Sequence, residues 1–329
     1  MVKNSRANIL VIGGAGYIGS HIVKALCDKR YSVTIYDNLS SGQKKNIDKR
    51  AKFYKGDILD KKSLDKIFSI KFHCVIHLAA LKSAGESMIR PEKYSENNIV
   101  GTINILNTMV KHRVKNIIFS SSAATYGNPK YLPMDEKHPQ EPENYYGYTK
   151  MEIERMLDWY SKLKGIHYAA LRYFNAAGYG SIKGLEKNPA NLLPIVMEVA
   201  VGKRESMQVF GNDYETKDGT GVRDYIHVLD LADAHILAMQ YITSGSNLII
   251  NLASGKGYSV LDVISTAERI TGKKILYDIA PRRAGDPAEV IASGDSAYKI
   301  LGWRPIYSEL DNIIRSMWNA YKNKVVKKK

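Results

Sequence analysis

The sequence predicts an α/β fold, in which a doubly wound parallel sheet is joined to a smaller lobe of mixed α and β structure. Two observations predict this fold. Strand and helix patterns alternate along the first half of the chain without a long irregular gap, as expected of βαβ units. After Asn175 the pattern changes to loops rich in Gly, Asn and Pro with short helices. A chain of 329 residues with 44% hydrophobic content can bury a large core.

The individual elements follow from periodicity and turn residues. Short apolar runs bounded by turn residues predict strands, and longer amphipathic stretches predict helices. The expected strands are 8–12, 32–36, 51–54, 74–79, 115–121, 167–173 and 248–252. The expected helices are one that ends at 26, then 61–69, 94–111, 146–163, 192–201 and 228–241. We therefore expect residues 1–178, with a return at 228–255, to form the sheet domain, and residues 179–227 and 256–329 to form the smaller lobe.

A glycine-rich turn stands between the first strand and the first helix, with the sequence Gly13-Gly14-Ala15-Gly16-Tyr17-Ile18-Gly19. Gly13 permits a tight turn, Gly16 lets the backbone approach a pyrophosphate, and Gly19 lets the helix pack close to the sheet. The helix N-terminus would face the anion. This spacing predicts a dinucleotide site of the Rossmann type.

The second strand ends in Asp37, about twenty residues beyond the glycines. A carboxylate at this separation is typical of the group that holds the adenosine ribose, and it would repel a 2′-phosphate. NAD is therefore favoured over NADP, although Lys44 and Lys45 are near in sequence.

Tyr146 and Lys150 follow a strand that ends in Ser120-Ser121-Ser122. Positions i and i+4 of a helix share a face, so the Lys150 ammonium is expected near the Tyr146 phenol. A nearby cation would lower the phenol pKa from about 10 towards neutrality and make it a general base for an alcohol proton. Ser122 would share the same substrate hydroxyl. The spacing alone also fits a solvated helix face, and the glycine turn upstream favours an active site.

Composition excludes several function classes. No apolar run approaches the roughly 18 residues of a membrane span, and the first apolar segment is a short strand rather than a signal peptide, so we expect a cytoplasmic protein. Cys27 and Cys74 lie in apolar segments without metal-type spacing, so we expect reduced thiols and no metal site. The net charge of +15 comes from dispersed lysines and a C-terminal run at 322–329, without aromatic interleaving, so no nucleic-acid partner is expected.

Nearly the whole chain resembles the extended short-chain dehydrogenase/reductases, and within them the UDP-glucose 4-epimerases. The segments that carry this resemblance are Gly13 to Gly19, Asp37-Asn38-Leu39, Gly56-Asp57-Ile58, His77 to Lys82, Gly85-Glu86-Ser87, Asn97-Asn98, Ser120-Ser121-Ser122, Tyr146 to Lys150, Leu171 to Asn175, Phe210 to Tyr214, Asp218 to Val228 and Pro281-Arg282-Arg283. The segment from Gly211 to His227 is the most particular to the epimerases.

The resemblance implies NAD as cofactor and reversible C4 epimerisation of UDP-glucose and UDP-galactose through a transient 4-keto sugar. Tyr146 would take the O4 proton, Ser122 would hydrogen-bond O4, and Lys150 would lower the Tyr146 pKa and contact the nicotinamide ribose. Further residues implied along the cofactor are Tyr17, Ile18, Asn38, Asp57, Ile58, Leu78, Ala79, Lys82, Asn97 and Tyr173.

For the UDP-sugar, the resemblance implies a diphosphate clamp of Arg223 and Arg283, whose guanidinium groups form forked hydrogen bonds with phosphate. Without it, Arg223 would equally well be a surface residue paired with Asp224. Other implied substrate contacts are Asn175, Asn191, Phe210 near the uracil, and Asp286 at the uridine ribose. The resemblance also implies a homodimer, formed when the helices at 94–111 and 146–163 pair with their counterparts in a four-helix bundle.

Two departures from the family pattern bear on specificity. Val290 stands where some epimerases carry a bulky tyrosine beside the sugar 2-position, so we hypothesise that UDP-GlcNAc and UDP-GalNAc are also accepted. Ala123 and Ala124 stand where related 4,6-dehydratases carry an acid/base pair, which disfavours dehydration. The alternatives that remain are a uronate 4-epimerase, a decarboxylase, or a non-enzymatic NAD-binding regulator, which a degenerate triad would favour.

Overall fold

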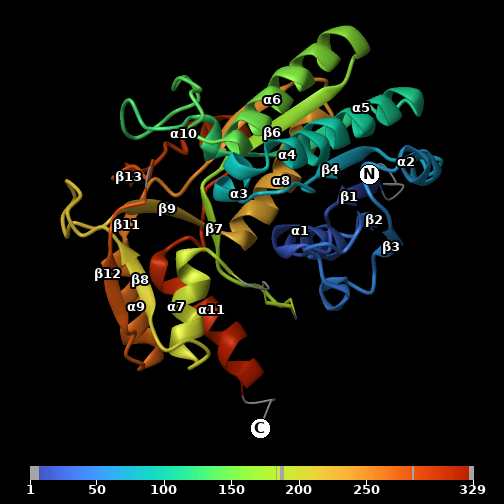
Figure 1. The fold of residues 1–329 in the computed structure, drawn as a ribbon. Helices are drawn as coiled ribbons and strands as arrows, with labels where there is room; N and C mark the ends of the chain where they lie inside the picture. The colour runs from blue at the N-terminus through green and yellow to red at the C-terminus, as the bar shows by residue number, and fades with distance from the viewer. Residues whose placement is uncertain (1–6, 183, 186–188, 284, 326–329) are drawn as a thin grey trace.

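Seven parallel strands form one sheet in the computed structural model, which describes residues 7–182, 184–185, 189–283 and 285–325 (Figure 1). From one edge to the other, the strands are β3 (Lys52–Lys55), β2 (Ser32–Asp37), β1 (Asn8–Ile12), β4 (Cys74–His77), β5 (Asn116–Ser122), β6 (His167–Tyr173) and β10 (Leu248–Leu252). The order reverses at β1, and ligands of such sheets bind outside the carboxyl ends at this switch point. The predicted doubly wound parallel sheet is confirmed.

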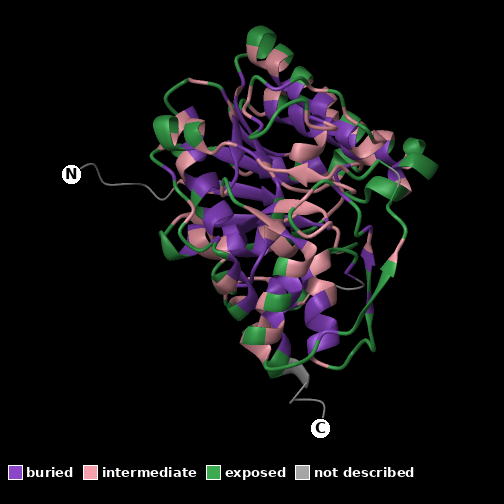
Figure 2. Ribbon diagram, turned by 90° about the vertical axis from the view of Figure 1, so that its left-hand side faces the viewer, coloured by how far each residue is buried: buried purple, intermediate pink, exposed green. Residues whose placement is uncertain are grey.

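Helices cover both faces of this sheet and leave its strands deeply buried, except for the exposed edge strand β3 (Figure 2). One face carries α1 (Tyr17–Asp28), α8 (Val228–Ile242) and α10 (Asp295–Leu301). The other carries α2 (Lys61–Phe68), α5 (Gly101–Lys111) and α6 (Tyr145–Lys164). Each face has its own apolar core, so the strands read as continuous apolar runs rather than alternating ones.

The expected helix at 94–111 is wrong as a single regular element. The chain instead forms α3 (Ala84–Ile89), α4 (Pro91–Tyr94), a π-helical turn at Ser95–Val100 and then α5. Within the π turn, the Asn98 amide accepts a hydrogen bond from the Leu81 N–H at 2.9 Å and donates to the Leu81 carbonyl at 3.0 Å. The π turn is therefore accompanied by a tertiary contact with Leu81, 17 residues earlier in the chain. The helical periodicity of the sequence does not predict such a contact. The other expected elements are confirmed with end shifts of one or two residues.

Among the described residues, the second part of the fold contains two small sheets and three helices around a separate core. In one sheet β9 (Val222–His227) lies between β11 (Gly257–Ser259) and β13 (Glu289–Val290), and β7 (Asn175–Ala177) also pairs with it. The other sheet pairs β8 (Met207–Phe210) with β12 (Tyr277–Ala280). The helices are α7 (Leu192–Ala200), α9 (Val260–Thr271) and α11 (Leu310–Val325). Although β10 rejoins the large sheet, the exact division of the chain into lobes stays a proposal, and residues 326–329 of the lysine run lie outside the described residues.

Two buried histidines make hydrogen bonds between segments that are far apart in the sequence. His21 on α1 accepts a hydrogen bond from the Gly180 N–H at 2.9 Å through Nε2, while its Nδ1 lies 2.8 Å from the Tyr17 carbonyl oxygen. His227 lies at the end of β9, with Nε2 3.1 Å from the Ser316 hydroxyl of α11. Burial lowers the pKa of each ring to about 4. Only a neutral His21 ring can accept from Gly180, so protonation breaks this contact.

We expect the protein to lose stability as the pH falls from about 6.5 to about 4. A histidine whose pKa is lower in the folded state favours folding above its unfolded pKa of about 6.5, and that contribution disappears towards the folded pKa. Each ring contributes on the order of 2–3 kcal/mol across this interval. Urea unfolding at pH 7 and pH 5 measures the loss. His21→Gln should reduce the pH dependence and His112→Gln, at a surface pair with Asp65, should not. An equal pH dependence in His21→Gln and the wild type would contradict the assignment.

Candidate active site

The glycine turn after β1 is so tight that Gly13 and Gly19 have no room for a side chain. Gly13 has a φ of +85°, and a Cβ there would lie 2.8 Å from the Ala79 backbone nitrogen. A Cβ on Gly19 would lie 2.3 Å from the Gly13 carbonyl oxygen. Gly16 is the N-cap of α1, and no side chain caps the helix there. The turn therefore presents an uncapped helix N-terminus with close backbone approach, which fits a dinucleotide pyrophosphate.

We expect Gly19→Ala to displace α1 from the turn and to lower the amount of NAD that copurifies with the protein. The added methyl would meet the backbone of the turn, which cannot move without disturbing the pyrophosphate site. Extraction of bound nucleotide and its ultraviolet quantification measure the effect. Gly272→Ala is the matched control for general strain, because Gly272 has a φ of +65° and a Cβ there would meet no heavy atom within 4 Å. Equal NAD content in the two variants would rule out the expected effect.

Asp37 lies directly beside this turn, as expected for a ribose-binding carboxylate. It is 7% exposed, and its two oxygens accept hydrogen bonds from the Ala15 N–H at 3.0 Å and the Leu39 N–H at 2.8 Å. The neighbouring Asn38 amide donates to Asp57 at 2.8 Å. Ile58 is buried against α5, so the residues expected at the adenine side lie together at the ends of β2 and β3.

The remaining residues expected along the cofactor lie in four places: after β4, in the π turn, on α1 and at the end of β6. Leu78 and Ala79 follow β4, where the Leu78 N–H donates to the Ile12 carbonyl at 2.9 Å. Asn97 lies in the π turn and donates to Asn98 at 2.9 Å. The Tyr17 ring packs against His21 and Tyr179, and its hydroxyl donates to the Gly178 carbonyl. Three more expected residues are the partly buried Ile18 on α1, the exposed Lys82 after β4 and Tyr173 at the end of β6.

Ser122, Tyr146 and Lys150 are brought together where β5 ends beside the first turns of α6. The Ser122 hydroxyl lies beside the Tyr146 phenol and favours its ionised form. The Lys150 ammonium donates to the Ser120 carbonyl at 2.7 Å, and Nζ lies 5.8 Å from the Tyr146 ring centroid. Asn144 caps α6 by accepting from the Gly147 N–H at 2.9 Å, which fixes where the helix begins. The predicted face shared by Tyr146 and Lys150 is therefore present.

Burial dominates the titration of both groups in this arrangement, and the expectation that Lys150 lowers the Tyr146 pKa stays a prediction. Burial raises the pKa of Tyr146 above its ordinary value, and the Ser122 hydroxyl opposes that change. Burial also lowers the pKa of Lys150 to about 7, because an ammonium in an apolar site loses its hydration. A lysine that is neutral before the tyrosine titrates exerts little attraction on the phenolate. The spacing in the sequence predicted that the Tyr146 and Lys150 side chains are neighbours, but it carries no information on how deeply the two groups are buried.

The residues expected at the substrate lie around β9. Its Arg223 is opposite Val290 in the ladder with β13, and Asn175 is opposite Tyr225 in the ladder with β7. Asn175 donates to the Asp224 carbonyl at 3.0 Å. Asn191 is the N-cap of α7, and its side chain makes no capping hydrogen bond there. These positions place Asn175, Arg223 and Val290 in one small sheet.

Two cationic side chains make pairings that the sequence did not suggest. Arg223 donates to Asp286 at 2.7 Å, so its surface pairing with Asp224 is wrong. Successive residues of a strand point to opposite faces, and Asp224 is buried, accepting from the backbone of Ser254 and Gly255 at 3.0 Å. Arg283 lies over the Phe210 ring, 3.9 Å from its centroid. Each of the two expected phosphate ligands thus stands beside a residue expected at the uridine end.

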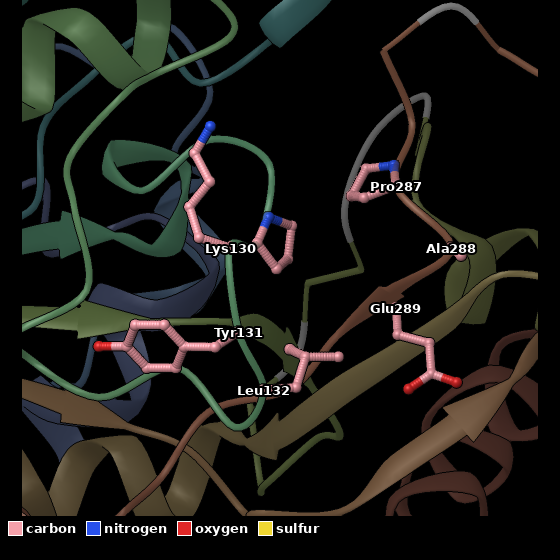
Figure 3. A pocket seen from close by; sticks show the side chains of 7 residues that line it. Lys130, Tyr131, Leu132, Pro287, Ala288 and Glu289 are labelled. Atoms are coloured by element: carbon pink, nitrogen blue, oxygen red, sulfur yellow. The ribbon is translucent and has the colours of Figure 1, made fainter.

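An open pocket of about 390 Å³ lies beside this lobe (Figure 3). Its lining comes from the loop at 129–132, after β5, and from residues 287–289, which lead into β13. The lining residues are Pro129, Lys130, Tyr131, Leu132, Pro287, Ala288 and Glu289. The pocket therefore adjoins Val290 in the chain, while the serine, tyrosine and lysine of the triad are not in its wall.

Within the described residues, no cluster of three or more His, Cys, Asp or Glu side chains could hold a metal ion. Both cysteines are free and buried. Among the helices that the structure describes, none is long and apolar enough to cross a membrane.

Comparison with known proteins agrees with this geometry. Residues 9–253 match the family model described as the NAD dependent epimerase/dehydratase family. The chain belongs to this family. A UDP-glucose 4-epimerase of Lacticaseibacillus casei is 46% identical over 96% of this chain and 97% of its own length. A UDP-glucose 4-epimerase of Brucella ovis, crystallised with NAD, has a TM-score of 0.93 at 42% identity, with coverage of 96% and 98% of the two chains. The epimerase of Bifidobacterium longum with NAD+ and UDP has a TM-score of 0.90 at 40% identity, with the same two coverages.

Membership of the NAD dependent epimerase/dehydratase family agrees with the strand order, the glycine turn and the Ser–Tyr–Lys arrangement. The sequence did not single out Asn98, which ties the loop after β4 to the π turn, or Glu154, which lies one turn beyond Lys150. For Glu154 the sequence did contain a signal, because Tyr146, Lys150 and Glu154 are spaced i, i+4, i+8 and so share one helix face.

Proposed function

We propose that this protein interconverts UDP-glucose and UDP-galactose by reversible inversion of C4 through a transient 4-keto sugar, with NAD bound throughout. The observation that carries the proposal is the Ser122–Tyr146–Lys150 arrangement together with the glycine turn before α1, where no side chain caps the helix N-terminus. Support also comes from near full-length similarity to UDP-glucose 4-epimerases, with structural relatives that hold NAD and UDP. A non-enzymatic regulator is disfavoured because the three catalytic groups are intact and adjacent.

Bound NAD would supply the acceptor and donor of the C4 hydride. The Gly13–Gly19 turn would hold its pyrophosphate, and Asp37 would accept hydrogen bonds from the adenosine ribose. Asp37 would repel a 2′-phosphate, which favours NAD over NADP. The other residues proposed along the cofactor are Tyr17, Ile18, Asn38, Asp57, Ile58, Leu78, Ala79, Lys82, Asn97 and Tyr173.

Tyr146 would take the proton from O4 as the hydride leaves C4, and it would return that proton when the hydride comes back to the opposite face. Ser122 would hold O4 near the phenol. Lys150, while charged, would stabilise the phenolate that this step requires. Because proton and hydride are both returned to the sugar, the substrate undergoes no net oxidation.

The UDP part must stay fixed while the keto sugar turns over. Arg223 and Arg283 would clamp the diphosphate with forked hydrogen bonds, and Asp286 would accept from the uridine ribose. In the structure Asp286 already accepts from Arg223, so a bound ribose would share this carboxylate. Phe210 would lie near the uracil, and Asn175 and Asn191 would contact the diphosphate or the sugar.

The side chain at position 290 suggests that N-acetylated sugars are also accepted. Val290 occupies a partly buried position against Tyr126, Met134, Phe174, Ala253 and Ala292. Valine leaves more room beside the sugar than the tyrosine that we expect at this position in some epimerases. UDP-GlcNAc and UDP-GalNAc are therefore proposed as additional substrates.

Proton NMR of the purified protein with UDP-galactose and, separately, UDP-GlcNAc tests the proposal through the anomeric signals of the C4 epimers. Conversion of both supports a dual-specificity epimerase. Conversion of UDP-galactose alone would keep the epimerase and remove the argument from Val290. Silence on both, with NAD confirmed bound, would shift the assignment to a carboxylated sugar, as in a uronate epimerase or decarboxylase.

We also propose a homodimer through a four-helix bundle of α5 and α6 with their counterparts. The support is a set of exposed large apolar side chains on and beside these helices, namely Ile89, Val100, Tyr148, Trp159 and Leu163. Trp159 is 60% exposed and Leu163 is 68% exposed, which is costly unless another surface covers them. Sedimentation of the wild type and of Leu163→Glu tests this, and a wild-type monomer would exclude it.

Two buried free thiols also fit the cytoplasmic location that we propose, since cytosolic proteins keep their cysteines reduced.

A further inference from the structure

A small apolar cluster lies at the carboxyl ends of three neighbouring strands of the large sheet. Ala123, Phe174 and Ala253 directly follow β5, β6 and β10. Ligands of such sheets bind outside the carboxyl ends of the strands, so the cluster lies on the ligand side of the sheet. The buried members are Tyr126, Met134, Phe174, Ala253 and Ala292, and the partly buried residues packed against them are Ala123 and Val290.

Three residues proposed at the substrate stand on or next to this cluster. Ser122 directly precedes Ala123, and Asn175 directly follows Phe174. Val290 packs on the cluster itself. Protein interiors are close-packed, so a change in the volume of the cluster is transmitted to the residues that rest on it. The cluster is therefore a common floor beneath these three positions.

Met134 enters this floor from the loop after β5, and hydrogen bonds fix its backbone there. Its side chain is 0% exposed. Its N–H donates to the Ile291 carbonyl at 2.9 Å, and its carbonyl accepts from the Ser293 N–H at 2.9 Å. The same carbonyl accepts from the Asn251 amide at 3.2 Å. These bonds set Met134 opposite Ala292 in a parallel bridge, so its side chain cannot leave the cluster by a shift of its own backbone.

Val290 is linked to Met134 through Ala292. Successive residues of an extended segment point to opposite sides, so Val290, at the end of β13, and Ala292 face the same way. Both pack in the cluster that Met134 fills. Val290 is only partly buried, so one side of it rests on the cluster and another side is open. The volume of Met134 therefore determines how far Val290 stands out from the floor.

The surroundings of the cluster are braced by buried hydrogen bonds. The Tyr126 hydroxyl donates to Asn251 at 2.6 Å and accepts from Arg172 at 3.0 Å. The Asn251 N–H, on β10, donates to Glu136 at 2.8 Å. The cost and the fate of a cavity depend on how well the site can collapse, and these contacts oppose collapse. A shorter side chain at Met134 would leave space that Val290 can occupy.

We propose that Met134 is a specificity-determining residue for the sugar: by filling the floor behind Val290, it sets the space open to the substituent at the sugar 2-position. The inference rests on the proposed function, in which Val290 lies beside that position. Met134 acts through Val290 and does not touch the sugar. An acetamido group needs more room than a hydroxyl, so shortening Met134 favours N-acetylated sugars. UDP-galactose and UDP-GalNAc differ only at this substituent and form a matched pair.

The test compares Met134→Ala with the wild type, both with NAD bound. Turnover followed by NMR gives kcat/KM for UDP-GalNAc and for UDP-galactose, and titration calorimetry gives the two Kd values without turnover. The ratio of kcat/KM for UDP-GalNAc to that for UDP-galactose should rise by about tenfold, because one methylene in an apolar pocket changes discrimination by about 10–200-fold. The Kd for UDP-GalNAc should fall relative to that for UDP-galactose. A purely structural role would weaken both sugars by one factor, and unchanged ratios would overturn the proposal.

Met109→Ala is the matched control. Met109 is also 0% exposed, but it lies near the end of α5, at the edge of the sheet where β5 begins. Its substitution should lower stability and leave both ratios unchanged, and an equal shift in this variant would contradict the proposal. If Met134→Ala does not fold, Met134→Val leaves a smaller cavity and should move both ratios in the same direction by less.

The two readouts separate this inference from the proposed function. A wild type that epimerises UDP-galactose, with the same two ratios in a folded Met134 variant, would refute the inference alone. A wild type that binds both sugars without epimerising UDP-galactose, and whose Kd ratio shifts on substitution, would refute the function alone. A wild type that binds neither sugar would refute both.

Discussion

Replacing Tyr146 with phenylalanine is expected to lower kcat for epimerisation by about 10²–10⁴-fold, with NAD content and fold unchanged. The phenol oxygen is the group proposed to move the O4 proton, and the Ser122 hydroxyl beside it favours its ionised form. The aromatic ring remains to fill the buried site. Turnover of UDP-galactose followed by NMR, together with quantification of bound NAD, gives both readouts.

Tyr148→Phe is the matched control for this experiment. Tyr148 lies on the same helix, two residues later, and is 39% exposed, so losing its hydroxyl should leave kcat within about twofold of the wild type. If Tyr146→Phe retained more than a tenth of the wild-type kcat while Tyr148→Phe did not, the base would be misassigned.

Replacing Arg223 with methionine is expected to raise the KM for UDP-galactose by about 10–100-fold. A hydrogen bond to a charged group contributes about 1.5–3 kcal/mol, and each 1.4 kcal/mol is a factor of ten in affinity. The change also leaves Asp286 without the guanidinium it contacts at 2.7 Å, and its unbalanced charge would then repel the diphosphate. Initial rates over a range of substrate concentrations separate KM from kcat.

Arg269→Met supplies the corresponding control. Arg269 forms a bidentate pair with Asp311, at 2.6 and 3.0 Å, on an exposed surface away from β9. Its loss should change neither KM nor kcat, because exposed ion pairs contribute at most about 1 kcal/mol to stability. A KM for Arg223→Met equal to that of Arg269→Met would exclude Arg223 from the clamp.

The pH dependence of activity bears on both the proposed base and its lysine. In the structure the Lys150 pKa is lowered to about 7 while that of Tyr146 is raised, the opposite order from what phenolate catalysis at neutral pH needs. Desolvation causes both shifts, because each group is buried at a place where its charged form is poorly hydrated. Glu154 is the carboxylate on the same helix face that counters this for Lys150.

Local patterns were sufficient for most of the large sheet. Five-residue apolar runs such as 8–12 predicted strands, and the glycine spacing predicted a turn whose positive φ at Gly13 the structure bears out. The helical turn at 95–100 was not predictable in this way. Its π geometry accompanies hydrogen bonds between Asn98 and Leu81, and these form only when the loop after β4 lies against the helix.

By itself the sequence determined the order of strands and helices, the glycine turn, Asp37 at the end of β2, and the shared face of Tyr146 and Lys150. Each of these depends on residues close together in the chain, where turn geometry and periodicity act directly. Tertiary structure alone decided that Arg223 pairs with Asp286, 63 residues away, and that the buried Glu154 pairs with Arg172. It also decided the pKa values of Tyr146 and Lys150, because burial depends on how distant segments pack and outweighs what a neighbour's charge predicts.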